Sequence, residues 1–467
     1  MSDELPEGWE RTTLKDVIDN HRGGVWGAEA KGKKGYPVLR STNMRGSKLD
    51  FTEVARCEIS NDVAKDVALQ AGDIIVSKSS GSPHLVGLPA LFEGSPDGQM
   101  YLYSNFTMRL RPSSHRINPK YLFHFLSGAK AEQDRRSMSQ DTSGLRNLKT
   151  GEYLAQPLPL PPLPEQQRIV EKIEKLFDES RTAREALDAV PSLLKRFRQS
   201  VLAKAFRGEL VEHDPNDEPA SVLLERIKAE RKVRSGDSST VARTKGKKYV
   251  EPAPIDTSEL PQLPEGWEWV SFDGLLDELK NGYFSKTPEF EPPGIPILRI
   301  SALRPRLVNF GELRYLREEM KKVSHYQLRN GDLLFTRYNG NLDLVGVCGM
   351  VRGLQVPIIY PDKLIRARIF SEYVLPEYLE IYFSTQVPRD IIEGKAKSSA
   401  GQQGISGKDL KNVPVALAPL AEQRRIVAKI ESLFAQAEAI EQAVEVARRR
   451  AEQIDQAILA RAFRGGM

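Results

Sequence analysis

Two stretches of the chain carry apolar residues at alternating steps of four and three, the spacing that keeps one seam of a helix facing a partner helix. The pattern runs from 169 to 201 and again from 426 to 458, with Glu, Gln, Lys and Arg thick at the flanking positions. We predict two long helices that form a coiled coil, in preference to amphipathic helices packed singly on a globular core. The predicted seam residues are Ile169, Ile173, Leu176, Leu187, Leu194, Phe197, Ile426, Ile430, Leu433, Ile440, Val444, Ile454 and Ile458.

Two prolines distinguish the first helical stretch from the second. Pro191 lies inside the first stretch, where Arg448 stands in the second, and proline removes a backbone donor and collides with the preceding turn. We therefore predict a kink or break near the middle of the first helix. Pro164, suited to the first turn of a helix, becomes Ala421 in the second stretch, so the two helices could start at different points.

The segments before the helices also occur twice. The phrase LPEGWE opens the chain and returns beyond its midpoint, and further motifs follow it in the same order at an offset of 257 to 259 residues. The matched pairs are 5–10 with 263–268, 36–45 with 295–304, 71–81 with 330–340, 118–126 with 375–383, 165–177 with 422–434, and 202–208 with 459–465. The chain is therefore a tandem duplication in which a mixed domain precedes each helical segment.

The expected organisation has five parts. We predict mixed domains at 1–160 and 263–417, helical regions at 161–233 and 418–467, and a flexible basic and proline-rich linker at 234–262. The fold class is α+β: two mixed α/β domains, each followed by a long helix, with the helices paired antiparallel within the chain about a pseudo-twofold axis. A helix over 169–201 would be about 50 Å long, enough to hold two domains about one DNA turn apart. Pairing with a second copy of the chain is the alternative, and tethering favours the intrachain pair.

Composition narrows the class of protein. A hydrophobic fraction of 40% with 28% charged residues is typical of a globular protein, and the absence of a long apolar run predicts a cytoplasmic protein without a membrane segment. Cys57 and Cys348 lie far apart and form no CxxC pair, so they indicate neither a zinc site nor a disulfide framework. The net charge of +5 is compatible with nucleic acid but does not establish binding to it.

Motifs for catalysis are not evident in the sequence. There is no (N/D)PP(Y/F) or Pro-Cys motif of a methyltransferase, and GAEAKGKK at 27–34 has Lys34 where a phosphate loop needs Ser or Thr. The six histidines show no HExxH or close metal-binding spacing, and His124 in YLFHFL is predicted to be a core residue. We predict no metal site and no catalytic residue in this chain.

The ordered double set of motifs resembles the specificity subunit of a type I restriction-modification enzyme. The resemblance rests on LPEGW, P-x-L-R, GD-[IL]-[IL]-x-[ST]-[KR], PPLPEQQRIV and AFRGEL, and it covers nearly the whole chain. It implies two target recognition domains that each read half of a bipartite, gapped site in double-stranded DNA. It also implies coiled-coil regions that dock methyltransferase subunits, with restriction and translocase subunits joining the complex. S-adenosylmethionine, ATP and Mg²⁺ are implied only for those partners.

Candidate DNA-binding residues lie in polar loops after the short apolar strands. Arg and Lys can bond guanine, Asn and Gln can bond adenine, and phosphate contacts add affinity without sequence preference. In the first domain the candidates are Arg40, Asn43, Arg45, Lys78, Ser79, His84, Gln140 and Arg146. In the second they are Arg299, Arg304, Arg337, Asn339, Asn341, Lys397, Gln402 and Gln403. Each could instead be a solvated surface residue, and for Arg40 and Arg299, within strand-like segments, a structural ion pair is the stronger alternative.

Two other classes of function stay open at this point. A coiled-coil adaptor whose paired domains bind protein would share the duplication and the helices, but it would lack salt-sensitive, sequence-selective DNA binding. A self-sufficient enzyme would require methylation or cleavage by the isolated chain.

Overall fold

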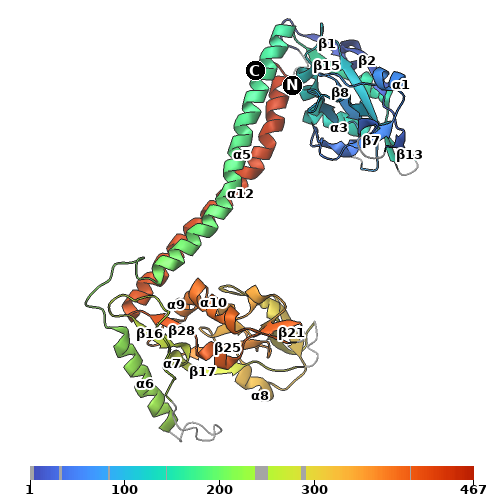
Figure 1. The fold of residues 1–467 in the computed structure, drawn as a ribbon. Coiled ribbons are helices and arrows are strands. Elements are labelled where there is room, and N and C mark those ends of the chain that lie inside the picture. The colour runs from blue at the N-terminus through green and yellow to red at the C-terminus, as the bar shows by residue number, and fades with distance from the viewer. Residues whose placement is uncertain are drawn as a thin grey trace. The chain divides into compact units, whose positions relative to one another are not determined.

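The computed structural model describes residues 5–30, 34–82, 85–142, 145–236, 251–285, 291–399 and 401–467. The chain divides into two compact units (Figure 1). Unit 1 comprises Met1–Ala189 and Ala443–Met467, and unit 2 comprises Val190–Gln442. Each unit therefore contains one mixed domain together with parts of both long helices.

Unit 1 is built around an antiparallel four-stranded sheet of order β10-β8-β12-β2. A second sheet of order β11-β4-β7-β3 and a small one of order β13-β14-β9 accompany it. Its strands are β1 (Glu10–Thr13), β2 (Ile18–Gly23), β3 (Ala28–Glu29), β4 (Tyr36–Leu39), β5 (Met44–Arg45), β6 (Lys48–Leu49), β7 (Ala55–Glu58), β8 (Ile74–Ser77), β9 (Ser79–Ser80), β10 (Pro89–Leu91), β11 (Leu102–Tyr103), β12 (Thr107–Pro112), β13 (Ser139–Thr142), β14 (Leu145–Leu148) and β15 (Pro157–Leu160). Its short helices are α1 (Asn61–Asp66), α2 (Pro119–Ser127), α3 (Ala129–Ser137) and α4 (Thr150–Leu154).

The central strand β8 explains the apolar run in GDIIVS. Successive side chains of a strand point to opposite faces of the sheet. Ile74 and Val76 accordingly join the core that includes α2, whereas Ile75 joins a second core with Val38 on β4. All four residues of β8 are buried, so the run is continuously apolar instead of alternating.

Unit 2 repeats this plan. Its main sheet has the order β17-β25-β22-β24, again antiparallel, and its small sheet has the order β23-β27-β26. Its strands are β16 (Glu268–Ser271), β17 (Leu276–Asn281), β18 (Ile295–Leu298), β19 (Leu303–Arg304), β20 (Leu307–Val308), β21 (Leu313–Leu316), β22 (Leu333–Thr336), β23 (Tyr338–Asn339), β24 (Cys348–Met350), β25 (Leu364–Ile369), β26 (Lys397–Ser399), β27 (Gln402–Gly404) and β28 (Pro414–Leu417). Its short helices are α7 (Phe272–Leu275), α8 (Met320–Val323), α9 (Pro376–Tyr382), α10 (Gln386–Lys395) and α11 (Gly407–Lys411).

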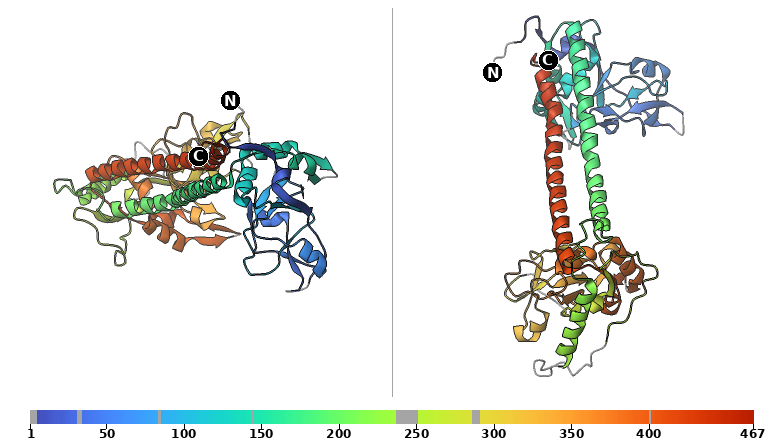
Figure 2. Two further views of the ribbon diagram at one scale, coloured as in Figure 1. Left: turned by 90° about the horizontal axis from the view of Figure 1, so that it is seen from above. Right: turned by 90° about the vertical axis from the view of Figure 1, so that its left-hand side faces the viewer.

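The two predicted long helices are present as α5 (Leu163–Ala205) and α12 (Leu420–Ala462), each 43 residues long. They lie side by side within each unit (Figure 2). In unit 1 Arg184 pairs with Asp455 and Asp188 pairs with Arg448. Residues further along α5 therefore meet residues that come earlier in α12. The helices therefore pair antiparallel within one chain. A further helix, α6 (Ala220–Gly236), packs Ala220 and Ile227 into the core of unit 2, and residues 237–250 of the predicted linker lie outside the described residues.

Each long helix begins on its own domain and ends on the other. Phe463 at the end of α12 packs against Tyr121 and Phe125 in unit 1. Phe206 just after α5 packs against Tyr378 and Tyr382 in unit 2. The repeated AFRG motif thus completes the core of the domain from the opposite copy.

Of the predicted kink or break at Pro191, the break does not occur, because α5 is one uninterrupted helix through that residue. Proline cannot donate to the carbonyl four residues earlier, which here belongs to Leu187. Arg448 donates to that Leu187 oxygen at 3.4 Å, so a side chain of α12 supplies the missing donor. The exchange of Pro164 for Ala421 also leaves the starts unchanged, since α5 begins at Leu163 and α12 at the matching Leu420.

The seam between the helices differs from the predicted one near its middle. Phe197, Ile440 and Ile454 are 40%, 47% and 46% exposed, whereas the residues one position later, Arg198, Glu441 and Asp455, face the partner helix as ion pairs. Both choices satisfy a step of three or four, so apolar spacing alone does not separate them. At the ends of the helices the predicted seam residues are buried, with Ile169, Ile173 and Ile458 in the core of unit 1 and Ile426 and Ile430 in the core of unit 2.

Candidate nucleic-acid interface

The small sheet of each unit brings predicted DNA-binding residues together from distant parts of the chain. In unit 1, β14 pairs with both β9 and β13, so that Arg146 lies opposite Ser80 on one side and Asp141 on the other. The loop after GDIIVSK therefore meets the later loop SQDTSGLRN in one sheet. Unit 2 repeats the arrangement, with Asn339 opposite Gln403 and Ser399 opposite Gln402.

In unit 1 the gathered residues differ in how free their side chains are. The Ser79 hydroxyl is buried and donates to Oδ1 of Asn147 at 2.5 Å. Lys78 and Arg146 are half-buried, and the backbone of Lys78 is fixed by hydrogen bonds to Phe106 and Leu148. Gln140 lies on β13 opposite Asn147. The small sheet thus places the half-buried Arg146 near Ser79 and Asn147, whose side chains are hydrogen-bonded to each other.

In unit 2 the gathered set is richer in amides. Asn339 and Asn341 shape a turn, since Asn339 accepts from the Asn341 backbone and Asn341 accepts from the Asp343 backbone, each at 3.0 Å. Lys397 and Gln402 are exposed and Gln403 is half-buried. The guanidinium carbon of Arg337 lies 4.7 Å from the centre of the Tyr338 ring, which stacks the cation at the start of the sheet.

The other predicted residues lie apart from the small sheets. Arg45 and Arg304 are exposed on the equivalent hairpins β5–β6 and β19–β20, and Arg45 lies 3.4 Å from Asp50. Arg299 lies 3.8 Å from Glu312, in line with the structural ion pair named as its alternative, and Arg40 is half-buried. His84 lies outside the described residues.

Asn43 is the predicted residue least available to a base. It is 4% exposed, its amide group donates to the carbonyls of Asp50 and Glu53, and its oxygen accepts from the Arg40 backbone. These bonds hold the hairpin that follows it. The matching residue of unit 2 is Ala302, which also is buried.

Sequence reasoning missed two residues that order the small sheets. Asn147 accepts the Ser79 hydroxyl, and Tyr338 supports Arg337 while its ring fills the space where any side chain at Gly404 would stand. The pairing of two loops more than sixty residues apart is what reveals Asn147, and no local motif carries that signal.

The aspartate of the GD motif has a structural role in both units. Asp73 and Asp332 accept the guanidinium groups of Arg111 and Arg368 on the neighbouring strand, at 2.7 Å each for the shortest contact. Each aspartate also accepts a backbone N–H three residues before it, from Gln70 or Arg329. The hydrogen bonds to Asp73 raise the pKa of Arg111. The motif thus ties two strands together beneath the small sheet.

A second repeated contact fixes the start of each long helix. Nε1 of Trp9 donates to Glu165 at 3.1 Å, and Nε1 of Trp267 donates to Glu422 at 3.0 Å, so LPEGW bonds to the EQ pair of its own copy. The next residue, Gln166 or Gln423, is fully buried. Its side chain accepts from the backbone at Asn118 or Leu375 and donates to the carbonyl at Pro161 or Ala418.

Among the described residues, no helix has the length and apolar character needed to cross a membrane, and no group of His, Cys, Asp or Glu is placed to hold a metal ion. Cys57 and Cys348 are buried free thiols.

Comparison with known proteins identifies the family. The model of the type I restriction modification DNA specificity domain matches residues 6–189 and 264–446. The EcoKI specificity subunit of Escherichia coli K12 is 34% identical over 99% of this chain and 90% of its own length. The StySPI specificity subunit of Salmonella potsdam is 28% identical over the same shares. The fold is similar to the crystal structure of the HsdS subunit from Thermoanaerobacter tengcongensis, with a TM-score of 0.63 at 20% identity, covering 99% of this chain and 98% of that one.

The chain therefore belongs to the family of type I restriction-modification specificity subunits, with two DNA specificity domains in tandem. The predicted α+β class, the duplication and the two long helices are confirmed.

Proposed function

We propose that this chain reads a bipartite, gapped sequence in double-stranded DNA and delivers the methyltransferase subunits of its complex to that site. The observation that carries the proposal is the pair of small sheets, β13-β14-β9 and β23-β27-β26, on one shared framework. Their side chains differ. The small sheet of unit 1 carries Ser79 and Arg146, whereas that of unit 2 carries Asn339, Gln402 and Gln403. Equivalent scaffolds with different polar groups suit two half-sites of different sequence.

The methyltransferase partner would dock on the long helices. Several large apolar side chains on these helices are 40% to 50% exposed. They are Leu193, Phe197 and Ile440 in unit 2 and Val446 and Ile454 in unit 1. Large apolar side chains exposed along a helix favour a protein partner over solvent. Restriction and translocase subunits would join through that assembly.

The chemistry of methylation and cleavage is assigned to the partners. We propose that S-adenosylmethionine, ATP and Mg²⁺ are bound by those subunits and that this chain acts in the cytoplasm, where the DNA of the cell lies. The chain contributes sequence selectivity and geometry, and no residue of it is proposed to touch a reacting atom.

Methylation of the genome tests the proposal directly. We expect a gapped, two-part adenine methylation motif in cells that carry this gene and its methyltransferase, and loss of the motif when this gene alone is deleted. Unchanged methylation with an active methyltransferase would refute the aiming role and favour the protein adaptor.

Exchange of the small-sheet residues assigns each half-site. Replacing Gln402 and Gln403 together with alanine should relax or abolish the half-site read by unit 2, because a lost bidentate base contact costs about 1–3 kcal/mol. The half-site read by unit 1 should stay unchanged and serves as the internal control.

A further inference from the structure

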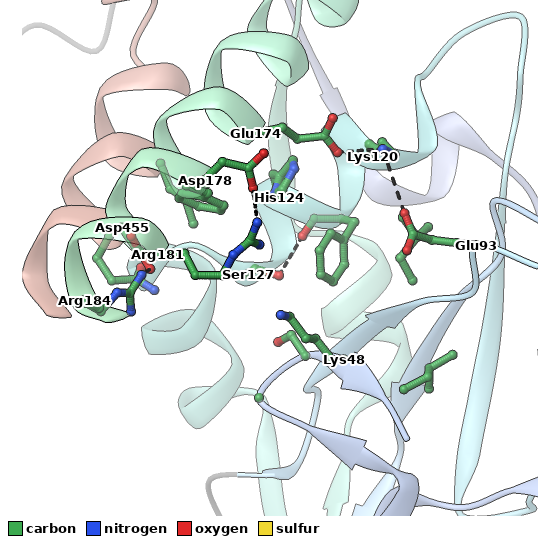
Figure 3. A pocket seen from close by; sticks show the side chains of 18 of the residues that line it. Lys48, Glu93, Lys120, His124, Ser127, Glu174, Asp178, Arg181, Arg184 and Asp455 are labelled. Carbon is green, nitrogen blue, oxygen red and sulfur yellow. Dashed lines mark hydrogen bonds and ion pairs between the residues drawn. The ribbon is translucent and has the colours of Figure 1, made fainter. Parts of the chain in front are cut away.

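A cleft of about 1030 Å³ opens in unit 1 beside the two long helices (Figure 3). Its walls come from the turn of the β5–β6 hairpin, from α2, from the first half of α5 and from the last turns of α12. The aromatic rings of Phe123 and Phe177 and the imidazole of His124 lie on the helical side. Neither the small sheet nor any predicted DNA-binding residue lines it.

The corresponding place in unit 2 is filled by one arginine. Arg306 occupies the turn of the β19–β20 hairpin, and its guanidinium carbon lies 5.2 Å from the centre of the Phe434 ring on α12. Its Nε lies 3.9 Å from Glu380 of α9. Burial against these groups lowers the pKa of Arg306, with Glu380 and Glu431 opposing the shift.

The cleft of unit 1 keeps part of the surroundings of Arg306 but has no arginine at its position. Phe177 matches Phe434, Glu174 matches Glu431, and Ser47 stands at the position of Arg306. The backbone is alike at that point, because both residues adopt a left-handed conformation with φ of 65° at Ser47 and 58° at Arg306. The Phe177 ring and the Glu174 carboxylate are retained, whereas Arg306 is replaced by Ser47 and its other acidic neighbour, Glu380, is replaced by Phe123.

The arginine of the neighbouring ion pair stands at a different position, because Arg184 in unit 1 matches Glu441 in unit 2. Arg198 lies 6.0 Å from the Phe434 ring in unit 2, and its counterpart in unit 1 is Asp455, which lines the cleft. Six carboxylates and four cations line the cleft in all. Lys120 lies between Glu174, at 2.6 Å, and Glu93, at 3.8 Å, and Arg184 pairs with Asp455. Asp178 pairs with Arg181 and Asp188 with Arg448, which leaves Glu185 as the one lining carboxylate without an ion pair among the described residues.

His124 does not oppose a cation there. It is 6% exposed and burial lowers its pKa to about 4, so the ring is neutral at pH 7. Its edge meets the Phe177 ring with the centroids 5.6 Å apart, and its Nε2 has no hydrogen-bond partner among the described residues. A neutral ring with an unused nitrogen is suited to accept a hydrogen bond from an incoming donor.

We propose that the cleft of unit 1 receives an arginine side chain from a methyltransferase subunit docked beside α5, in the way that Arg306 fills unit 2 from within the chain. The guanidinium would stack on Phe177 and face the carboxylates, an arrangement that suits arginine better than lysine. The identity of the carrier rests on the proposed function, whereas the chemistry of the cleft rests on the comparison of the two units.

The variant Ser47→Arg installs the internal plug and is expected to fold, because Arg306 already holds the same backbone conformation in unit 2. We expect it to weaken binding of the methyltransferase subunit to the full chain by about ten- to a hundred-fold, the usual loss when a buried anchor is excluded. Ser47→Ala, which leaves the cleft open, is the matched control and should bind as the wild type does. Calorimetry of the assembly measures all three.

A probe of the free full-length chain tests the cleft without the partner. N-acetylarginine amide should shift the imidazole resonances of His124, whereas N-acetylcitrulline amide, which is neutral and of similar shape, should not. Ser47→Arg should abolish the shift. Equal responses to the two probes, or an unaltered response in Ser47→Arg, would overturn the proposal.

The two hypotheses fail separately. If the wild-type chain does not bind the methyltransferase subunit, the proposed function and the carrier are wrong, while the probe still decides the chemistry of the cleft. If the wild-type chain binds the subunit and Ser47→Arg binds it equally well, only the arginine proposal is overturned.

Discussion

Units 1 and 2 share the plan of the main sheet, the small sheet and the contacts at the helix ends, yet they bury charge differently. In unit 2 the fully buried Glu380 accepts two hydrogen bonds from Arg352, and Arg306 lies close by. The matching residues of unit 1 are Phe123, Glu93 and Ser47. All three members of the cluster changed together.

This concerted change has an electrostatic reason. A buried charge whose partner is removed destabilises a protein strongly, whereas replacing the whole set by other groups can be nearly neutral. The contacts that stay constant are those to the backbone, such as Gln166 and Gln423. The buried pair of Asp73 with Arg111 is also retained, as Asp332 with Arg368, whereas the set around Glu380 is exchanged as a whole.

The largest effect is expected from breaking the set in unit 2. Glu380→Ala leaves Arg352 and the backbone N–H of Met350 without their acceptor and should lower the stability of unit 2 by about 3–5 kcal/mol. Hydrogen exchange of the β24 amides measures the change, with the exposed Glu372→Ala as control. Equal protection in the two variants would show that Arg352 is satisfied in another way.

Acid should lower the stability of unit 1 more than that of unit 2, because His124 of unit 1 corresponds to Ile381 in unit 2. The unfolded chain binds a proton on this side chain near pH 6.5, but the folded chain does so only near pH 4, so stability falls as the pH drops through that window. The loss should reach about 2–3 kcal/mol near pH 4.5. Urea unfolding at pH 7 and pH 4.5 should show it in the wild type and much less in His124→Ile.

A smaller difference is expected at the repeated tryptophan contact. Glu422→Ala strands the Nε1 of the buried Trp267 and should cost about 1–3 kcal/mol. Glu165→Ala frees the Nε1 of the half-buried Trp9, which water can reach, and should cost less than half of that. Thermal unfolding of both variants, beside Glu→Gln versions that retain an acceptor, makes the comparison. A larger loss in unit 1 would contradict the burial argument.

The smallest effect should come from the ion pairs between the helices. Arg184 with Asp455 and Arg198 with Glu441 are related by the duplication, since residue 184 matches 441 and residue 198 matches 455. In both pairs the arginine belongs to α5 and the carboxylate to α12. Two α12 helices paired in this register would oppose carboxylates, so the charges favour α5 with α12.

Arg198→Glu should therefore cost about 0.5–1 kcal/mol, and adding Glu441→Arg should restore most of the loss. A double-mutant cycle by urea unfolding measures the coupling energy between residues 198 and 441. If the losses of stability in the two single variants simply add up in the double variant, the two residues are not coupled.

Much of the fold could be predicted from the sequence because the duplication displays each motif twice. The heptads at Ile169 and Ile426 predict the helices, and the paired GD motifs mark the central strands. What the pattern could not resolve was the middle of the seam, where Ile440 and Ile454 are apolar but exposed and the neighbouring charges face inward. Pro191 was misjudged because the compensating donor, Arg448, comes from a distant part of the chain.

The candidate site could be predicted only in part from the sequence. Loops around Ser79 and Arg146 were chosen separately, and their union in one sheet depends on a pairing that no local pattern encodes. Asn43 has the right chemistry for a base, but three backbone contacts occupy it. The cleft beside α5 was invisible for a related reason, since the exchange of Ser47 for Arg306 has meaning only once Phe177 and Phe434 are placed.

The crossing of the AFRG motifs sets an order for folding during synthesis. The mixed domain of unit 1 is translated before unit 2, but Phe463, which packs on Tyr121 and Phe125, is translated after the whole of unit 2. Unit 2 has all of Val190–Gln442 available earlier. Unit 1 is thus translated earlier than unit 2 but can close its core only later, and until then the apolar surface around Tyr121 is open to chaperones and to misassembly with other chains.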